Sequence, residues 1–258
     1  MHYGPRIPQS GLQLCLDASN PKSYPGSGTT WYDISGNGRD FTCASEPTFN
    51  TQPSVGGYRQ PDSLDSTKFT GPASNSFGIT DTSGVSFIFY LTNDALTAKS
   101  AFKWYGGDGS GTDARGYFSH LPWNNGYIYF DKMTVTDDSL TNNGSTVTSA
   151  GGGRLHTNMN SGPGNPGSHV NYFWVHAFTC SSDGATMKIY RDGELLTSRT
   201  NAGSNVTLSS DGATVGGDDT YASGWNAKMG AFLCYNRELS AAEVLQITNA
   251  YRYRDGDA

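Results

Sequence analysis

Short strand-like segments separated by turn-forming residues run through most of the chain, and this rhythm limits the possible folds more than any other feature. More than ten stretches of apolar or alternating residues are separated by clusters of Gly, Pro, Asn, Asp and Ser. Only one stretch, near the C-terminus, has helical periodicity. Many short strands at hairpin spacing with a single helix predict an all-β fold, an antiparallel sandwich of two sheets.

Two of these segments indicate how the layers are built. In "LQLCLD" (Leu12–Asp17), side chains alternate between the two faces of a strand, so Leu12, Leu14 and Leu16 should share one buried face. "VSFIFYL" (residues 85–91) is apolar on both faces. A strand with two apolar faces is typical of the centre of a sheet covered on both sides.

The helix is predicted within "YNRELSAAEVLQITNAYR" (residues 235–252). Ser240 and Glu243 fit an S-x-x-E capping box, in which each side chain satisfies a backbone N–H of the other residue. Leu239 and Val244 are placed to pack together beside this cap. An apolar stripe follows at spacings of three and four residues: Val244, Ile247 and Tyr251. The helix is therefore amphipathic and should close the sandwich by lying against it.

Length and charge narrow the classes of protein. With 258 residues the chain fits one large all-β domain, and its net charge of −6 comes without any Lys/Arg-dense run. We therefore expect no nucleic-acid partner. No apolar run is long enough to span a bilayer, so we expect no membrane association. The opening "MHYGPRIPQSG" lacks the apolar core of a signal peptide, so we expect the protein to be made in a cytoplasm.

The cysteines and glycosylation-like motifs add little. The four cysteines lie far apart without C-x-x-C spacing, and we expect thiols packed as small apolar groups, with two disulfides as the alternative. Asn143 and Asn205 match acceptor motifs for N-glycosylation but are expected to be ordinary polar loop residues.

One polar, Gly-rich segment interrupts the strand rhythm at residues 134–169. It is longer than ordinary loops, so it should cover one end or face of the sandwich as an insertion. The expected organisation is an N-terminal arm at 1–10, a single sandwich at 11–254 that contains this loop insertion, and a C-terminal tail at 255–258.

Four stretches in order resemble the laminin-G-like branch of the concanavalin A-like lectin/glucanase superfamily. They are the opening "GLQLCLDASNPKSY" with "WYDISGNGRDF", then "WVHAFTCSSDGATMKIYRDGELL", "ATVGGDD" and "GAFLCYNRELSAAEV". The resemblance spans about residues 11–251. It implies a jelly-roll sandwich closed by one short C-terminal helix, with variable loops at the concave face and rim carrying any ligand site.

The opening segment "GLQLCLDASNPKSYPGSGTTWYDISGNG" (residues 11–38) resembles the form this domain takes in tailed-phage structural proteins. That resemblance implies a non-catalytic protein of the virion surface: a capsid decoration, head fibre or tail-associated module. Its partners would be other virion proteins and host or environmental polysaccharide, and it would be a homo-oligomer or be displayed in many copies. Two alternatives stay open: a stand-alone carbohydrate-binding lectin and a glycan hydrolase.

The carboxylates argue against hydrolysis. Retaining glycosidases need two carboxyl groups about 5 Å apart. The four glutamates Glu46, Glu194, Glu238 and Glu243 form no E-x-D-x-E pattern, and no strand carries D-x-D. There is no G-x-S-x-G motif either, and His176 lies within a strand, where a core histidine is the simpler interpretation. We therefore expect no catalysis.

Oxygen-rich loops suggest where a calcium ion could bind, since Ca²⁺ prefers carboxylate and carbonyl ligands. The candidates are Asp108 and Asp113 in "GGDGSGTDAR" and Asp218 and Asp219 in "GGDDTY". Asp137 and Asp138 in "TDDSL" are a further pair. The alternative is that these are solvated turn residues. No cofactor is expected to be required.

Glycan binding needs an aromatic ring that stacks on a sugar, with planar amides or carboxylates beside it. Three clusters have this composition: Trp104 and Tyr105 with Asp108; Trp123, Asn124, Asn125 and Tyr127; and Tyr221, Trp225 and Asn226 with Asp218 and Asp219. "PWNNGY" is the most persuasive, because a turn Trp followed by two Asn is difficult to bury completely. The alternative for each cluster is packing in the core.

Overall fold

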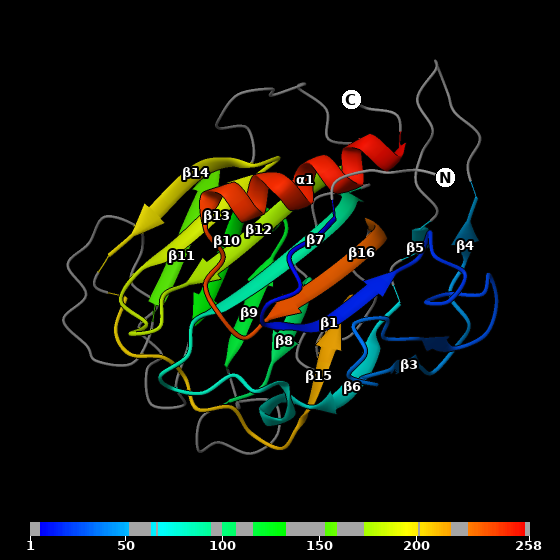
Figure 1. The fold of residues 1–258 in the computed structure, drawn as a ribbon, viewed down its shortest axis with the longest axis horizontal. Helices are drawn as coiled ribbons and strands as arrows, with labels where there is room; N and C mark the ends of the chain where they lie inside the picture. Colours follow the sequence, from blue (N-terminus) through cyan, green and yellow to red (C-terminus); the bar gives the residue numbers. More distant parts are fainter. Residues whose placement is uncertain are drawn as a thin grey trace.

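The computed structural model describes residues 6–51, 63–65, 67–93, 100–106, 116–132, 153–158, 173–200, 202–217 and 227–255. Within these ranges two eight-stranded antiparallel sheets form the sandwich that the sequence predicts, with one helix, α1 (Ala241–Asp255), at the C-terminal end (Figure 1). A helix able to span a bilayer is not found in this described part of the chain.

The first sheet, sheet A, has the order β14-β13-β12-β7-β16-β5-β4, with β1 also paired to β16. Its strands are β14 (Glu194–Arg199), β13 (Met187–Arg191), β12 (Trp174–Cys180), β7 (Val85–Asn93), β16 (Ala227–Tyr235), β5 (Ser63–Asp65), β4 (Phe49–Asn50) and β1 (Leu12–Asp17). The two longest strands, β7 and β16, lie side by side at its centre.

The second sheet, sheet B, has the order β11-β10-β9-β8-β15-β6-β3-β2. Its strands are β11 (Gly153–Asn158), β10 (Tyr127–Lys132), β9 (Tyr117–His120), β8 (Phe102–Trp104), β15 (Gly212–Val215), β6 (Phe69–Ala73), β3 (Phe41–Cys43) and β2 (Thr30–Trp31). A short 3-10 helix, η1 (Ser74–Phe77), follows β6. Strand β11 lies inside the segment expected to be a loop insertion at 134–169, so that expectation is wrong for residues 153–158.

The central strand β7 explains why one sheet carries two apolar layers. Phe87, Phe89 and Leu91 belong to the main core between the sheets, while Ile88 and Tyr90 belong to a second cluster on the opposite face. This is the alternation of a strand covered on both sides. The predicted central position of residues 85–91 is confirmed.

Strand β1 departs from the expected pattern. Leu14 and Leu16 lie in the main core, but Leu12 and Cys15 lie in the second cluster. The pairing of β1 with β16 shifts register between Leu12 and Leu14, as a β-bulge does. The prediction that Leu12 shares a face with the other two leucines is therefore wrong.

Helix α1 lies across the outer face of sheet A, as Figure 1 shows. The predicted cap is present, since the Ser240 N–H donates to Glu243 Oε2 at 2.9 Å and the Glu243 N–H donates to Ser240 Oγ at 3.3 Å. The predicted apolar residues Leu239, Val244, Ile247 and Tyr251 are all buried in the second cluster. The four cysteines, all within the described ranges, are thiols and not disulfides.

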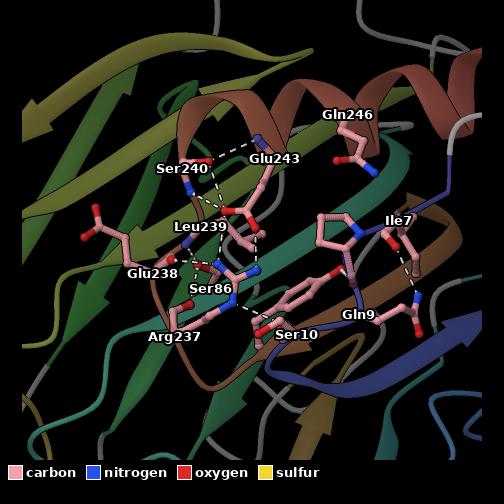
Figure 2. A network of polar contacts seen from close by, with 12 residues as sticks. Ile7, Gln9, Ser10, Ser86, Arg237, Glu238, Leu239, Ser240, Glu243 and Gln246 are labelled. Atoms are coloured by element: carbon pink, nitrogen blue, oxygen red, sulfur yellow. Dashed lines mark hydrogen bonds and ion pairs between the residues drawn. The ribbon is translucent and has the colours of Figure 1, made fainter.

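The N-terminal segment 6–10 is held by the C-terminal part of the chain (Figure 2). The Tyr235 hydroxyl donates to the Pro8 carbonyl at 3.0 Å, and the Arg237 guanidinium donates to the Ser10 carbonyl at 2.7 Å. The first described residues therefore pack against α1 and β16 of the same molecule, and the two ends of the described chain stabilise each other.

Glu243 links this network to pH. Its hydrogen bonds from Arg237 lower the pKa of Glu243 from 4.5 to about 2. The stabilisation is therefore fully present above pH 4.5 and is lost as the pH falls toward 2. We expect Glu243→Gln to lower the free energy of unfolding by about 1 kcal/mol at pH 7, and the difference from the parent protein to vanish near pH 2 in urea titrations followed by circular dichroism.

The matched control is Glu194→Gln, because Glu194 is exposed at the start of β14. It should change the free energy of unfolding by less than about 0.5 kcal/mol at either pH. A Glu243→Gln deficit that is as large at pH 2 as at pH 7 would contradict the ion-pair explanation.

Candidate functional site

The turn between β9 and β10 holds an aromatic ring and two amides at the surface. The backbone N–H of Trp123 donates to the Tyr127 carbonyl at 2.8 Å, and the backbone N–H of Gly126 donates to the Trp123 carbonyl at 2.9 Å. Asn125 Oδ1 accepts the Tyr127 N–H at 3.1 Å. These bonds fix the turn, leaving the Trp123 side chain half-buried and Asn124 and Asn125 exposed.

The outer face of sheet B continues this surface, because alternate positions on its strands point away from the main core. Tyr129 pairs with His120 on one side and with His156 on the other. The His120 ring lies 4.3 Å from the Trp123 ring, and the His156 ring lies 5.4 Å from that of Tyr129. We call Trp123, Asn124, Asn125, Tyr127, Tyr129 and His156, together with the buried His120 that packs against Trp123, the aromatic patch.

An ion pair lies beside the aromatic patch, two positions along β10 and β11 from Tyr129 and His156. Arg154 Nε and Nη2 donate to the Asp131 carboxylate at 2.8 and 2.7 Å, and the Asp131 side chain is fully buried. The Arg154 guanidinium also lies 4.7 Å from the centre of the Tyr129 ring. Asp131 and Arg154 neutralise each other's charge, and the Arg154 guanidinium packs over the Tyr129 ring in a cation–π contact.

This environment lowers the pKa of His156 and so favours its neutral form. Burial is the larger cause of its lowered pKa, and the nearby Arg154 charge acts in the same direction, while Asp131 opposes them. A neutral imidazole offers one donor and one acceptor. The aromatic patch therefore combines ring faces, amides and neutral polar groups, with its described charges paired.

Trp104 and Tyr105 do not contribute to a site. The Trp104 side chain is 0% exposed and packs among core rings such as Phe77, 5.0 Å away, and Phe87, 5.2 Å away. Tyr105 is 2% exposed, and the Lys103 amine lies over its ring at 4.3 Å. The expectation that these two rings bind glycan is wrong, because Trp104 on the central strand β8 and Tyr105 directly after it are both enclosed.

Several predicted residues lie outside the described ranges and remain predictions. They are the glycan candidates Tyr221, Trp225 and Asn226 and the calcium candidates Asp108, Asp113, Asp137, Asp138, Asp218 and Asp219. Among the residues that the structure describes, no three His, Cys, Asp or Glu side chains gather as a metal site requires.

Sequence reasoning missed five residues of this surface and its support: His120, Tyr129, Asp131, Arg154 and His156. The signal for Tyr129 was present, since it stands two positions after Tyr127 and shares its strand face. The signal for Arg154 and His156 was hidden, because they lie in the segment interpreted as a loop. Their position depends on the pairing of β11 with β10.

The four glutamates, all within the described ranges, have surface or structural positions. Glu238 pairs with Lys188 at 2.7 Å, and Glu243 caps α1. Glu46 accepts a backbone N–H from a neighbouring loop at 3.0 Å, and Glu194 is exposed on β14. None of these four lies on the aromatic patch.

Solved structures with similar folds include binding domains and an enzyme. A botulinum neurotoxin serotype D binding domain has a TM-score of 0.61 and 16% identity, covering 93% of this chain and 52% of its own. The serotype D ligand-binding domain in complex with N-acetylneuraminic acid has a TM-score of 0.62 and 14% identity, and the match covers 93% of this chain and 51% of that one. Trypanosoma rangeli sialidase in complex with sialic acid has a TM-score of 0.58 and 14% identity, and the match covers 95% of this chain and 34% of that one.

At these identities the likeness concerns the fold alone, and the chain spans about half of the toxin domains and a third of the sialidase. No curated protein matches the sequence. The family model of the concanavalin A-like lectin/glucanases superfamily, Laminin_G_3, matches residues 67–245, which is more than half of the chain. The two-sheet antiparallel sandwich agrees with that match, and the protein belongs to the concanavalin A-like lectin/glucanases superfamily.

Proposed function

We propose that the protein is a non-catalytic carbohydrate-binding protein and that its ligand lies on the aromatic patch. The observation that carries this proposal is the half-buried Trp123 ring with the exposed amides of Asn124 and Asn125 beside it. An indole face packs against the apolar face of a pyranose ring, and amides beside it can pair with the sugar hydroxyls. The fold likeness to a toxin domain in complex with N-acetylneuraminic acid supports carbohydrate binding in general.

The described chemistry of the patch favours neutral sugars. Arg154 is already paired with Asp131, and burial lowers the pKa of His156 and so favours its neutral form, which leaves little positive charge here for an acidic sugar. Ring stacking with amide hydrogen bonds instead suits neutral hexoses of a polysaccharide. Such contacts are weak singly, and display in many copies raises the overall avidity.

We further propose that the chain serves on the virion surface of a tailed phage, where it docks on other virion proteins as a homo-oligomer or in many copies. The support is the resemblance of residues 11–38 to tailed-phage structural proteins. Helix α1 covers sheet A, on the side of the sandwich opposite the aromatic patch. Docking through the α1 side would leave the patch facing outward.

Mass spectrometry of purified particles tests this location. A virion protein should co-purify with intact particles at a fixed copy number, whereas a stand-alone lectin should stay in the cleared lysate. Recovery of the chain only in the lysate would contradict the virion proposal and leave the carbohydrate proposal standing.

Glycan-array binding tests the carbohydrate proposal. We expect specific binding by the parent protein and a loss of about two- to tenfold with Trp123→Ala, because an aromatic stacking contact contributes about 0.5–1.5 kcal/mol. The matched control is Tyr32→Ala, which removes an exposed ring beside β2, at the opposite edge of sheet B from β11. Equal binding by both variants would contradict a site on the aromatic patch.

Glycan hydrolysis is the competing function, because the similar folds include a sialidase. Product release from polysaccharides or sialylated substrates measures it directly. We expect binding without release. Release that is lost when one carboxylate is replaced would establish an enzyme instead.

Calcium dependence is tested with the same array. The aromatic patch consists of rings and amides, with no carboxylate in it, so we expect removal of Ca²⁺ by EDTA to leave glycan binding unchanged. A loss restored by Ca²⁺ would favour a rim site formed by the candidates Asp108, Asp113, Asp218 and Asp219.

A further inference from the structure

A lysine occupies a core position on β10. Ile128 and Phe130 point into the main core, and Lys132 follows at the next position of the same face. Its side chain is 0% exposed. An apolar side chain in this place would avoid the desolvation of an amine, so Lys132 is a departure from the pattern that the fold requires.

The Lys132 amine meets a thiol of the opposite sheet. Nζ donates to the Gly184 carbonyl at 2.6 Å and to the Gly203 carbonyl at 3.1 Å. It also lies 3.9 Å from Cys180 Sγ, on β12 of sheet A, and Cys180 is itself 0% exposed. The amine of one sheet and the thiol of the other are thus adjacent inside the sandwich.

Burial favours the uncharged forms of both groups. It lowers the pKa of Lys132, an effect that Cys180 and Asp183 oppose and Arg199 strengthens. It raises the pKa of Cys180 to about 11, and the Lys132 charge acts against this rise. Attack on an electrophilic sulfur needs the lone pair of the uncharged amine, and a lowered pKa of Lys132 increases the fraction of the amine in that form.

We propose that Lys132 and Cys180 form an oxidation-dependent covalent cross-link between the two sheets. A peroxide first oxidises the Cys180 thiol to a sulfenic acid, with one oxygen transferred to Sγ and one water released. Lys132 Nζ then attacks Sγ, the N–S bond forms, the S–O bond breaks, and the departing hydroxide leaves with an amine proton as a second water. Sulfur loses two electrons, and the O–O bond of the peroxide accepts them.

The chain supplies an internal comparison. Cys43 is half-buried on β3, and its thiol donates to the Ser45 carbonyl at 2.9 Å. Because the thiolate is the form that reacts with peroxide, the deeply buried Cys180 should react slowly at neutral pH and faster as the pH rises. Cys43→Ser should leave the cross-link unchanged, and Cys180→Ser should abolish it.

Peptide mapping by mass spectrometry tests the proposal. The folded protein is treated with hydrogen peroxide, its remaining thiols are alkylated in denaturant, and it is digested without reductant. We expect a linked pair of peptides containing Lys132 and Cys180, lighter by two hydrogens than the two separate peptides and released by dithiothreitol. Cys180 found as an unlinked sulfenic, sulfinic or sulfonic acid, or still alkylated after Cys43 is fully oxidised, would overturn the proposal.

Thermal unfolding gives an independent readout. A bond that joins residues 48 apart in the sequence constrains the unfolded chain, so peroxide should raise the Tm and dithiothreitol should reverse the rise. The rise should persist in Cys43→Ser and be absent in Cys180→Ser. If Lys132 has only a structural role, the Tm should be the same before and after peroxide, and that result would contradict the cross-link.

Discussion

Replacing Phe87 with alanine is expected to lower the free energy of unfolding by about 3–5 kcal/mol, as for large aromatic residues removed from a packed core. The Phe87 side chain is 0% exposed and lies between the sheets, with ring centres 4.4 Å from Phe102 and 5.2 Å from Trp104. The rings of Tyr117, Phe130 and Phe232 also surround it. Truncation leaves a cavity that two rigid sheets cannot close, and denaturant unfolding measures the loss.

The matched control is Phe49→Ala. Phe49 is half-buried on the two-residue strand β4 and packs against the Tyr24 ring at 5.3 Å. Because less apolar surface is buried there, we expect a loss of about 1–2 kcal/mol. A Phe87→Ala loss no larger than that of Phe49→Ala would show that the rings between the sheets are not the main core.

Asn205→Ala is expected to cost about 3 kcal/mol, because the buried Tyr117 hydroxyl and three part-buried carbonyls lose their partner together. Asn205 Oδ1 accepts the Tyr117 hydroxyl at 2.9 Å. Its Nδ2 contacts the carbonyls of Ser83 at 2.9 Å, Ser181 at 3.1 Å and Ser182 at 2.9 Å. One amide thus joins three segments distant in the sequence, and denaturant unfolding measures its contribution.

Asn236→Ala is the control for this prediction. The Asn236 side chain is half-buried and donates to the Gly78 carbonyl at 3.3 Å. Its loss should cost about 0.5–1 kcal/mol. Equal losses in the two variants would mean that the Asn205 contacts contribute little. Asn205 was expected to be an ordinary polar loop residue, but its 7% exposure and these bonds make it a structural one.

The sequence was sufficient to predict the architecture where local patterns decide it. Residues 85–91 carry apolar side chains on both faces, and β7 lies at the centre of sheet A with a covered face on each side. Ser240 and Glu243 form the cap that their spacing predicts. Leu12 was misplaced because a bulge in a pairing with β16, more than two hundred residues away, decides its face.

The candidate site was less predictable because it depends on strand register. Trp104 and Trp123 have similar polar neighbours in the sequence. Trp104 lies on the central strand β8 and is buried, whereas Trp123 lies on the turn between β9 and β10 and is half-buried. Likewise Asp131 and Arg154 come together only when β10 pairs with β11. Composition identified the "PWNNGY" turn, but only the sheet shows which side chains accompany it.

The crystal structure of the protein with an oligosaccharide selected on the glycan array tests the central claim most directly. The account predicts a sugar ring stacked on the Trp123 indole, with its hydroxyls within hydrogen-bond distance of Asn124 or Asn125 and its glycosidic bonds intact. A sugar bound on the face covered by α1, or cleaved between two carboxylates, would contradict it.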